Sequence, residues 1–119
     1  MNVGDVGQII PHIYAAVDNR QGEHHVSIIE MDGKLCDQVI SILIEPWANY
    51  SYVSPDLVDK CGLSKELKEE SWLVQLATST KKQVHQWVRY CAFDLNGMPT
   101  TTHLNVLPLG SYNILLGMD

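Results

Sequence analysis

The chain has 119 residues, 45% of them hydrophobic and 18% charged, and its formal net charge is −6. This length suits a single domain with one modest core. The negative charge argues against nucleic acid as a partner, because phosphate binding needs clustered Lys and Arg. No apolar run is long enough to cross a membrane and the N-terminus is not a signal peptide, so we expect an intracellular, cytoplasmic protein.

The N-terminal part of the chain, residues 1–22, lacks clean periodicity, and we expect a linker there that precedes one domain at residues 23–119. In this domain, residues 24–31 alternate with β-branched side chains, and residues 34–44 return as a second strand. Asp32-Gly33 between them is a strong two-residue turn signal, so the pattern predicts a β-hairpin that turns at Asp32-Gly33.

The second strand of this hairpin leads directly to Glu45. The apolar run at residues 42–44 predicts a buried strand, and Pro46 breaks the chain just after it. A strand that hands one acid to a tight loop is how a carboxylate is presented in a cleft. A short aromatic strand at residues 50–53 is predicted to follow.

A short helix is predicted at residues 55–61 from signals at both of its ends. Ser54 is the N-cap, Pro55 occupies the first helical position and Gly62 supplies the stop. The charged stretch at residues 64–71 then predicts a solvated connector or a turn of helix. We expect its glutamates to be surface residues, because nothing apolar surrounds them to shift a pKa; they are Glu66, Glu69 and Glu70.

Two further hairpins are predicted in the second half of the chain. Residues 72–78 and 83–95 are strand-like runs joined by residues 79–82, and Asn96-Gly97 is a type I′ turn signal before a strand at residues 100–106. Together with the first hairpin, this pattern predicts a mainly β fold, a closed or half-closed barrel with one short helix.

The histidines and cysteines do not indicate a metal site. His24 and His25 are adjacent, and adjacent residues of a strand point to opposite faces. Cys36, Cys61 and Cys91 are widely spaced, and an odd count without C-x-x-C spacing argues against a disulfide framework or a zinc site. We therefore expect no metal, no cofactor, and free, half-buried thiols that act as small hydrophobes.

Two stretches resemble the retropepsin-like aspartic proteases, above all the protease segment of plant gypsy-class LTR retrotransposon polyproteins. Residues 42–54, Ile-Leu-Ile-Glu-Pro-Trp-Ala-Asn-Tyr-Ser-Tyr-Val-Ser, are similar to the family's apolar-Leu-Ile-Asp-Ser/Thr-Gly-Ala-Thr/Ser-His-Ser-Phe/Tyr-Ile. Residues 107–119 are similar to its Leu-Pro-Leu-Gly-x-Tyr-Asp-apolar-apolar-Ile/Leu-Gly-Met-Asp. Residues 71–78 and 11–21 also resemble the plant elements, so the resemblance covers nearly the whole chain.

The resemblance implies a retropepsin-like barrel, with residues 72–95 as the flap that closes over substrate. It implies an aspartic endopeptidase that processes its own polyprotein as a homodimer and binds a peptide or polyprotein segment. It assigns the catalytic carboxylate to Glu45. The implied substrate-binding residues are Ala48, Ala77, Thr78 and Ser79. In the family a helix and a last strand follow the closing motif, and we expect both to be missing here, which argues against a stable dimer.

The loop departs from the family at three successive positions. Glu45 replaces Asp, and its extra methylene moves the carboxylate by about an ångström, which can cost on the order of a hundredfold in rate. Pro46 replaces Ser/Thr and has no N–H, and Trp47 replaces a Gly at which two loop backbones approach closely. Ser79 also stands where relatives often carry Gly, so we expect a stiffer or differently shaped flap tip.

These departures predict a degenerate, inactive copy of the protease. The alternative is a non-catalytic protein-binding or dimerising β module. A cleavage assay at mildly acidic pH separates the two.

Overall fold

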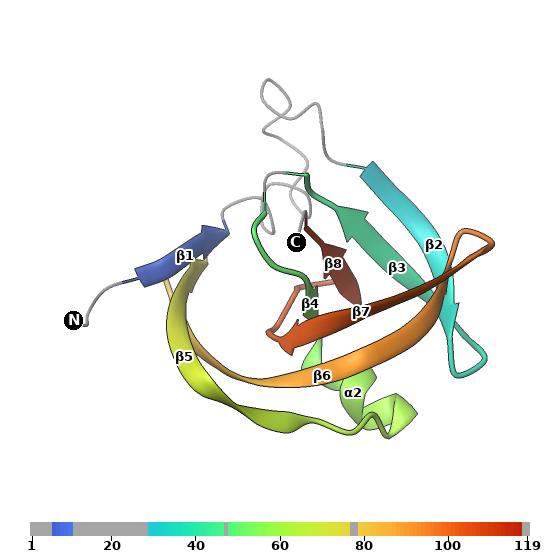
Figure 1. Ribbon diagram of the computed structural model, residues 1–119. Coiled ribbons are helices and arrows are strands. Elements are labelled where there is room, and N and C mark those ends of the chain that lie inside the picture. The colour runs from blue at the N-terminus through green and yellow to red at the C-terminus, as the bar shows by residue number, and fades with distance from the viewer. Residues whose placement is uncertain (1–5, 11–28, 47, 77–78, 118–119) are drawn as a thin grey trace.

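The computed structural model describes residues 6–10, 29–46, 48–76 and 79–117, which form a strongly curved sheet with one helix (Figure 1). The elements are β1 (Val6–Ile10), β2 (Ile29–Leu35), β3 (Gln38–Ile44), β4 (Tyr52–Val53), α2 (Pro55–Cys61), β5 (Glu66–Leu76), β6 (Lys81–Leu95), β7 (Met98–Val106) and β8 (Ile114–Leu116). β1 lies within the stretch predicted as a linker, so this part of residues 1–22 is a strand.

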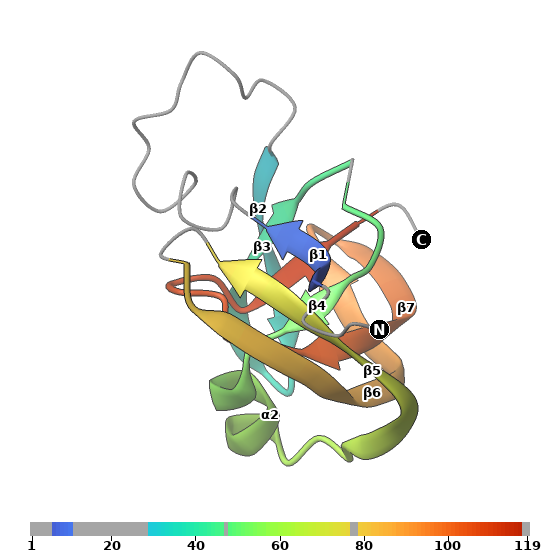
Figure 2. The same ribbon diagram turned by 90° about the vertical axis from the view of Figure 1, so that its left-hand side faces the viewer.

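The sheet closes into a barrel because β6 pairs on both of its sides. Neighbouring strands follow the order β6-β2-β3-β8-β4-β7, and a further β6–β7 pairing closes the ring. β5 and then β1 extend the sheet from β6, and Figure 2 shows these strands side by side across one side of the barrel, with α2 at its lower end. The predicted mainly β barrel with one short helix is confirmed.

The first hairpin forms, but its predicted turn at Asp32-Gly33 is wrong. The turn lies at Cys36-Asp37, whose φ angles of 52° and 63° are those of a type I′ turn. Gly33 instead lies inside β2, where an added Cβ would collide with the carbonyl oxygen of Asp94. Gly33 therefore permits a close approach between β2 and β6. In the sequence, a glycine required for this reason looks the same as one required for a turn.

Helix α2 begins and ends at the predicted residues. The Ser54 Oγ accepts a hydrogen bond from the Leu57 N–H at 3.2 Å, and Gly62 follows with a left-handed φ of 59°. Leu57 and Val58 are buried against the barrel. No helix in the described ranges is long and apolar enough to cross a membrane.

The second hairpin consists of β5 and β6, and β5 begins earlier than predicted. The connector expected at residues 64–71 is wrong from Glu66 onward, because Glu66 and Leu67 already pair with β6. Between Leu67 and Trp72 the register is irregular. This part of the strand is mostly exposed on both faces, so its sequence carries no apolar alternation. The surface position of its three glutamates is confirmed.

The third hairpin turns at the predicted Asn96-Gly97, with φ angles of 50° and 93°. β7 starts two residues before the predicted strand, at Met98.

The core has two apolar clusters, one on each side of β3, β4 and β8. Adjacent residues of a strand point to opposite faces, and in each of these strands one adjacent pair has both of its members buried. The pairs are Ile42 and Leu43, Tyr52 and Val53, and Ile114 and Leu115. This part of the sheet is therefore buried on both faces, and it carries the loop of Glu45.

Candidate active site

Glu45 follows the last residue of β3, where β3 runs parallel to β8. Ile44 pairs with Leu116, and the Glu45 N–H then donates a hydrogen bond to the Leu116 carbonyl oxygen at 2.9 Å. The ladder thus continues one residue beyond the strand. The buried strand presents Glu45 in a loop, as the sequence predicts.

The loop after Glu45 folds back over Gly117. The Ala48 N–H donates to the Glu45 carbonyl at 2.9 Å, and the Gly117 N–H donates to the Ser51 Oγ at 3.0 Å. A Cβ at Gly117 would lie 2.5 Å from the carbonyl oxygens of both Ala48 and Tyr50. The loop can take this shape because position 117 has no side chain.

The Glu45 side chain is 2% exposed, and it is the buried charged residue among those that the structure describes. Burial disfavours the carboxylate and raises the pKa of Glu45 to about 7. At mildly acidic pH the group is therefore a neutral acid that can donate a proton. It becomes a base only near neutral pH and above.

A protein-family model described as retroviral aspartyl protease matches residues 10–119 of this chain. The chain belongs to the retroviral aspartyl protease family. The match includes the Glu45 loop, the β5–β6 hairpin and β8.

A solved structure of the same fold comes from Leishmania major. The chain is similar to the retroviral protease-like domain of Ddi1 from Leishmania major, with a TM-score of 0.59 and 11% sequence identity over 80% of this chain and 75% of that one. It is also similar to protein Lpg0085 of unknown function from Legionella pneumophila, with a TM-score of 0.46 and 14% identity over 76% of this chain and 80% of that one. No curated protein sequence matches the chain significantly. At 11% identity the likeness to the Ddi1 domain shows the fold alone.

The substrate-binding residues implied by the family resemblance are only partly within the described ranges. Ala48 is 4% exposed and belongs to a core cluster, so its side chain offers little surface to a ligand. Ser79 is exposed at the end of the β5–β6 hairpin, with a left-handed φ of 72°. Ala77 and Thr78 lie outside the described residues, as does Trp47. The substrate-binding roles of Ala48, Ala77, Thr78 and Ser79 stay predictions.

We call the loop that follows β3, from Glu45 to Ser51, the active loop. A cluster of side chains that the sequence did not reveal lies between β5, β6 and this loop. We call Lys68, Trp72, Trp87 and Asn105 the Lys68 cluster. The Lys68 Nζ lies 4.6 Å from the ring centroid of Trp72 and 4.1 Å from that of Trp87, and it donates a hydrogen bond to the Asn105 Oδ1 at 2.9 Å. The Tyr50 ring, from the loop itself, stacks on Trp72 with a centroid distance of 4.8 Å.

The Lys68 cluster supports the far end of the active loop through Asn105. The backbone N–H and the side-chain Nδ2 of Asn105 both donate to the Ser51 carbonyl, at 2.9 and 3.1 Å. Ser51 is also the residue whose hydroxyl receives the Gly117 N–H. The position of the loop therefore depends on a hydrogen-bonded path from Lys68 to Gly117.

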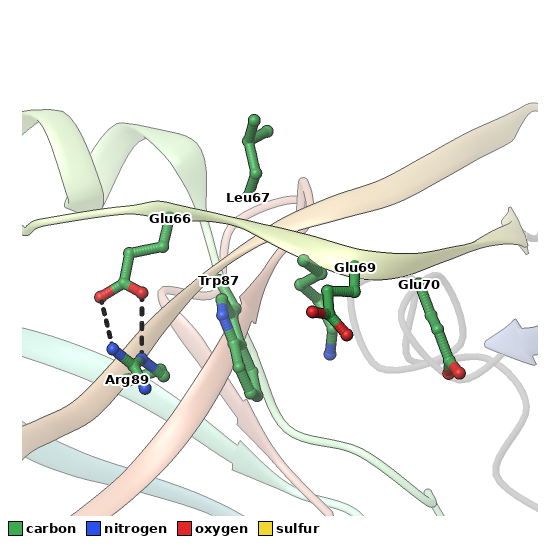
Figure 3. A pocket seen from close by; sticks show the side chains of 7 residues that line it. Glu66, Leu67, Glu69, Glu70, Trp87 and Arg89 are labelled. Atoms are coloured by element: carbon green, nitrogen blue, oxygen red, sulfur yellow. Dashed lines mark hydrogen bonds and ion pairs between the residues drawn. The ribbon is translucent and has the colours of Figure 1, made fainter.

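A shallow hollow of about 460 Å³ lies on the outer side of this cluster. In Figure 3 Glu66 faces Arg89 beside the Trp87 ring, whereas Leu67 points away. The Arg89 Nε lies 3.0 Å from Glu66 Oε1, and both side chains are about half exposed. The carboxylates here are exposed, so this hollow offers no acid comparable with the buried Glu45.

Proposed function

We propose that this domain comes from the protease segment of a plant gypsy-class LTR retrotransposon polyprotein, and that it has lost peptidase activity. The proposal is supported by Glu45-Pro46-Trp47-Ala48, which stand where relatives carry Asp-Ser/Thr-Gly-Ala. The observation that carries it is the burial of Glu45, which keeps this carboxyl neutral below about pH 7.

Aspartic proteases need two carboxylates about 3 Å apart that share one proton, so that one acts as acid and the other as base. In a homodimer of this chain each copy would supply one Glu45. Because burial raises the pKa of the single Glu45 to about 7, each copy would bring a protonated carboxyl to the pair at mildly acidic pH, whereas activation of water needs one of the two to be ionised. The longer side chain also displaces each oxygen from the position of an Asp oxygen.

The test is cleavage of a peptide from the parent polyprotein, in a comparison of loop and C-terminus. We expect no cleavage by the unmodified chain. We expect cleavage by a chain that combines Glu45→Asp, Pro46→Ser and Trp47→Gly and is extended by a family-like helix and strand. The substitutions would supply the carboxylate pair, and the extension would supply the dimer. The matched control carries Glu45→Asn with the same two loop changes and extension, and should be inactive. Cleavage by the unmodified chain that Glu45→Ala abolishes would contradict the proposal.

A second candidate function is that of a non-catalytic module that binds an extended peptide. It is favoured by β1, which pairs in parallel with β5 from Val6 opposite Leu73 to Ile10 opposite Leu76. The edge of the β5–β6 hairpin thus accepts an added strand through main-chain hydrogen bonds. The family match begins at residue 10, so most of β1 precedes it.

This second function is tested with a chain that lacks residues 1–22 and a synthetic peptide of residues 6–10 extended at both ends. Binding should protect from hydrogen exchange those amides among residues 73–76 that point away from β6, which alternate along β5. A peptide with proline at alternate positions is the control, because proline cannot donate to a strand ladder. Equal protection by both peptides would exclude strand addition at this edge.

A further inference from the structure

Cys36 and Cys61 are 25 positions apart in the sequence and meet in the fold. Cys36 is in the β2–β3 turn and Cys61 is the last residue of α2. The Cys36 thiol lies 3.8 Å from the Cys61 carbonyl oxygen, and the Cys61 thiol lies 3.8 Å from the Leu35 carbonyl oxygen, which belongs to the peptide bond that precedes Cys36. Each sulfur therefore lies against the backbone of the other cysteine.

The Cys36 thiol also affects the ionisation of Cys61. Burial raises the pKa of Cys61, and a hydrogen bond with the Cys36 thiol and the charge of Cys36 add to the increase. A disulfide needs two Cβ atoms about 3.5–4.5 Å apart, and the two 3.8 Å contacts place each sulfur beside the backbone of the other cysteine, as such a bond requires. Because Cys36 is a turn residue, small changes there disturb few packed atoms.

The cysteines differ in access to solvent. Cys36 is exposed, Cys61 is half-buried and Cys91 in β6 is buried, at 4% exposure. A soluble oxidant therefore reaches Cys36 first. Cys91 is near enough for the charges of the other two to raise its pKa, after burial as the main cause. Among the described residues no group of three or more metal-ligating side chains could hold a metal ion.

We propose that Cys36 and Cys61 form an oxidation site, at which hydrogen peroxide converts the pair to a disulfide that ties the β2–β3 turn to the end of α2. The Cys36 thiolate attacks one peroxide oxygen, the O–O bond breaks, and a sulfenic acid and hydroxide form. The Cys61 sulfur then attacks the Cys36 sulfur, the S–O bond breaks, and the leaving hydroxide takes the Cys61 proton as water. Two thiols and one peroxide give one disulfide and two waters, so the sulfurs lose the two electrons that the peroxide gains.

The disulfide would join elements at the opposite end of β3 from Glu45. The turn at Cys36-Asp37 precedes β3, and Glu45 follows it. Oxidation should therefore raise the thermal stability of the barrel without a change in the titration of Glu45. A closed loop of this size is expected to raise Tm by roughly 10 °C, because it restricts the unfolded chain.

The experiment treats the full chain with a slight excess of hydrogen peroxide. We expect free thiols to fall from three to one, the mass to fall by two hydrogens, and Tm to rise, all reversed by dithiothreitol. Trypsin cleaves after Lys34, Lys60, Lys65 and Arg89, so the linked fragments should be residues 35–60 and 61–65, with residues 90–119 unlinked. This map is obtained on the unmodified chain and does not depend on whether a variant folds.

The variants separate the pair from the third cysteine. Cys36→Ser and Cys61→Ser should each abolish the disulfide and the rise in Tm, and Cys91→Ser, the matched control, should keep both. The proposal is overturned if residues 90–119 take part in the linkage, if the linkage joins two chains, or if peroxide adds oxygen to the thiols without linking them.

Discussion

Two ionisable side chains near the active loop, Glu45 and Lys68, differ in the charge that they carry in the folded chain. Glu45 is buried and burial raises its pKa to about 7, so its neutral form is favoured. Burial also lowers the pKa of Lys68, but the charge of Glu70 opposes that shift, and the Lys68 Nζ lies over two tryptophan rings and donates to Asn105. The loop is therefore built around a neutral acid, whereas its support is built around a cation. The acid within the loop is therefore neutral below about pH 7, and a positive charge lies next to the loop.

The pH dependence of stability should show the largest effect. The folded pKa of Glu45 is about 7 and its ordinary value, taken for the unfolded chain, is 4.5. Between these values the folded chain binds more protons than the unfolded chain, so stability falls as pH rises through this window and is level above it. Glu45 should account for a loss of about 3 kcal/mol.

Urea unfolding at a series of pH values checks this, with Glu45→Gln as the comparison. The Gln variant should lack this loss and be more stable than the unmodified chain above pH 7. Parallel pH profiles for the two proteins would mean that burial does not shift the Glu45 pKa.

Gly117→Ala should displace the active loop, which lies over Gly117. The added Cβ would lie 2.5 Å from the carbonyl oxygens of Ala48 and Tyr50, so the loop must move, at a cost of about 2–3 kcal/mol. Gly62→Ala is the control, because its Cβ meets open space and only its left-handed φ of 59° costs about 1 kcal/mol. Denaturant unfolding that gives equal losses would show that the contact over Gly117 is relaxed at little cost.

Lys68→Met tests the support at nearly constant side-chain length. The change removes the cation from the two rings and the donor from the Asn105 Oδ1, and should cost about 1–2 kcal/mol. Lys65→Met, an exposed lysine three positions earlier, is the matched control and should leave unfolding unchanged. A variant as stable as the unmodified chain would show that the aromatic rings alone hold the loop.

Loss of the exposed ion pair between Glu66 and Arg89 should have the smallest effect on the free energy of unfolding. Its side chains are 44% and 47% exposed, so solvent screens the attraction. Glu66→Gln should cost about 0.5 kcal/mol at low salt and nothing measurable at high salt. An equal loss at both salt concentrations would place this pair in a drier environment than its exposure indicates.

Local signals in the sequence predicted local structure well. Ser54 and Gly62 bound a helix through backbone contacts within a few residues, and Asn96-Gly97 turns as expected. The turn at Asp32-Gly33 failed because a glycine serves tight turns and close approaches alike, and only the position of Asp94 shows which one applies. The early start of β5 was missed because a strand exposed on both faces has no apolar alternation.

The candidate site also has a part that the sequence predicted and a part that it did not. The apolar strand before Glu45 and the resemblance in the loop predicted which carboxylate is presented. Its burial and pKa could not be predicted, because they depend on β8 and on segments far apart in the chain. The Lys68 cluster joins residues from β5, β6 and β7, and no spacing in the sequence connects them. For the same reason Cys36 and Cys61 gave no sign that they meet.

The place of β8 in the sheet has a consequence for the order of events during synthesis. β8 lies between β3 and β4, and the pairing of Ile42 with Ile114 joins residues far apart in the chain. As the chain leaves the ribosome, β2, β3 and α2 emerge long before the strand that fills the gap between β3 and β4. Such non-local pairing makes folding slow. The Glu45 loop therefore takes shape only after Gly117 has emerged, so the β5–β6 hairpin and β7 are translated before the loop takes this shape.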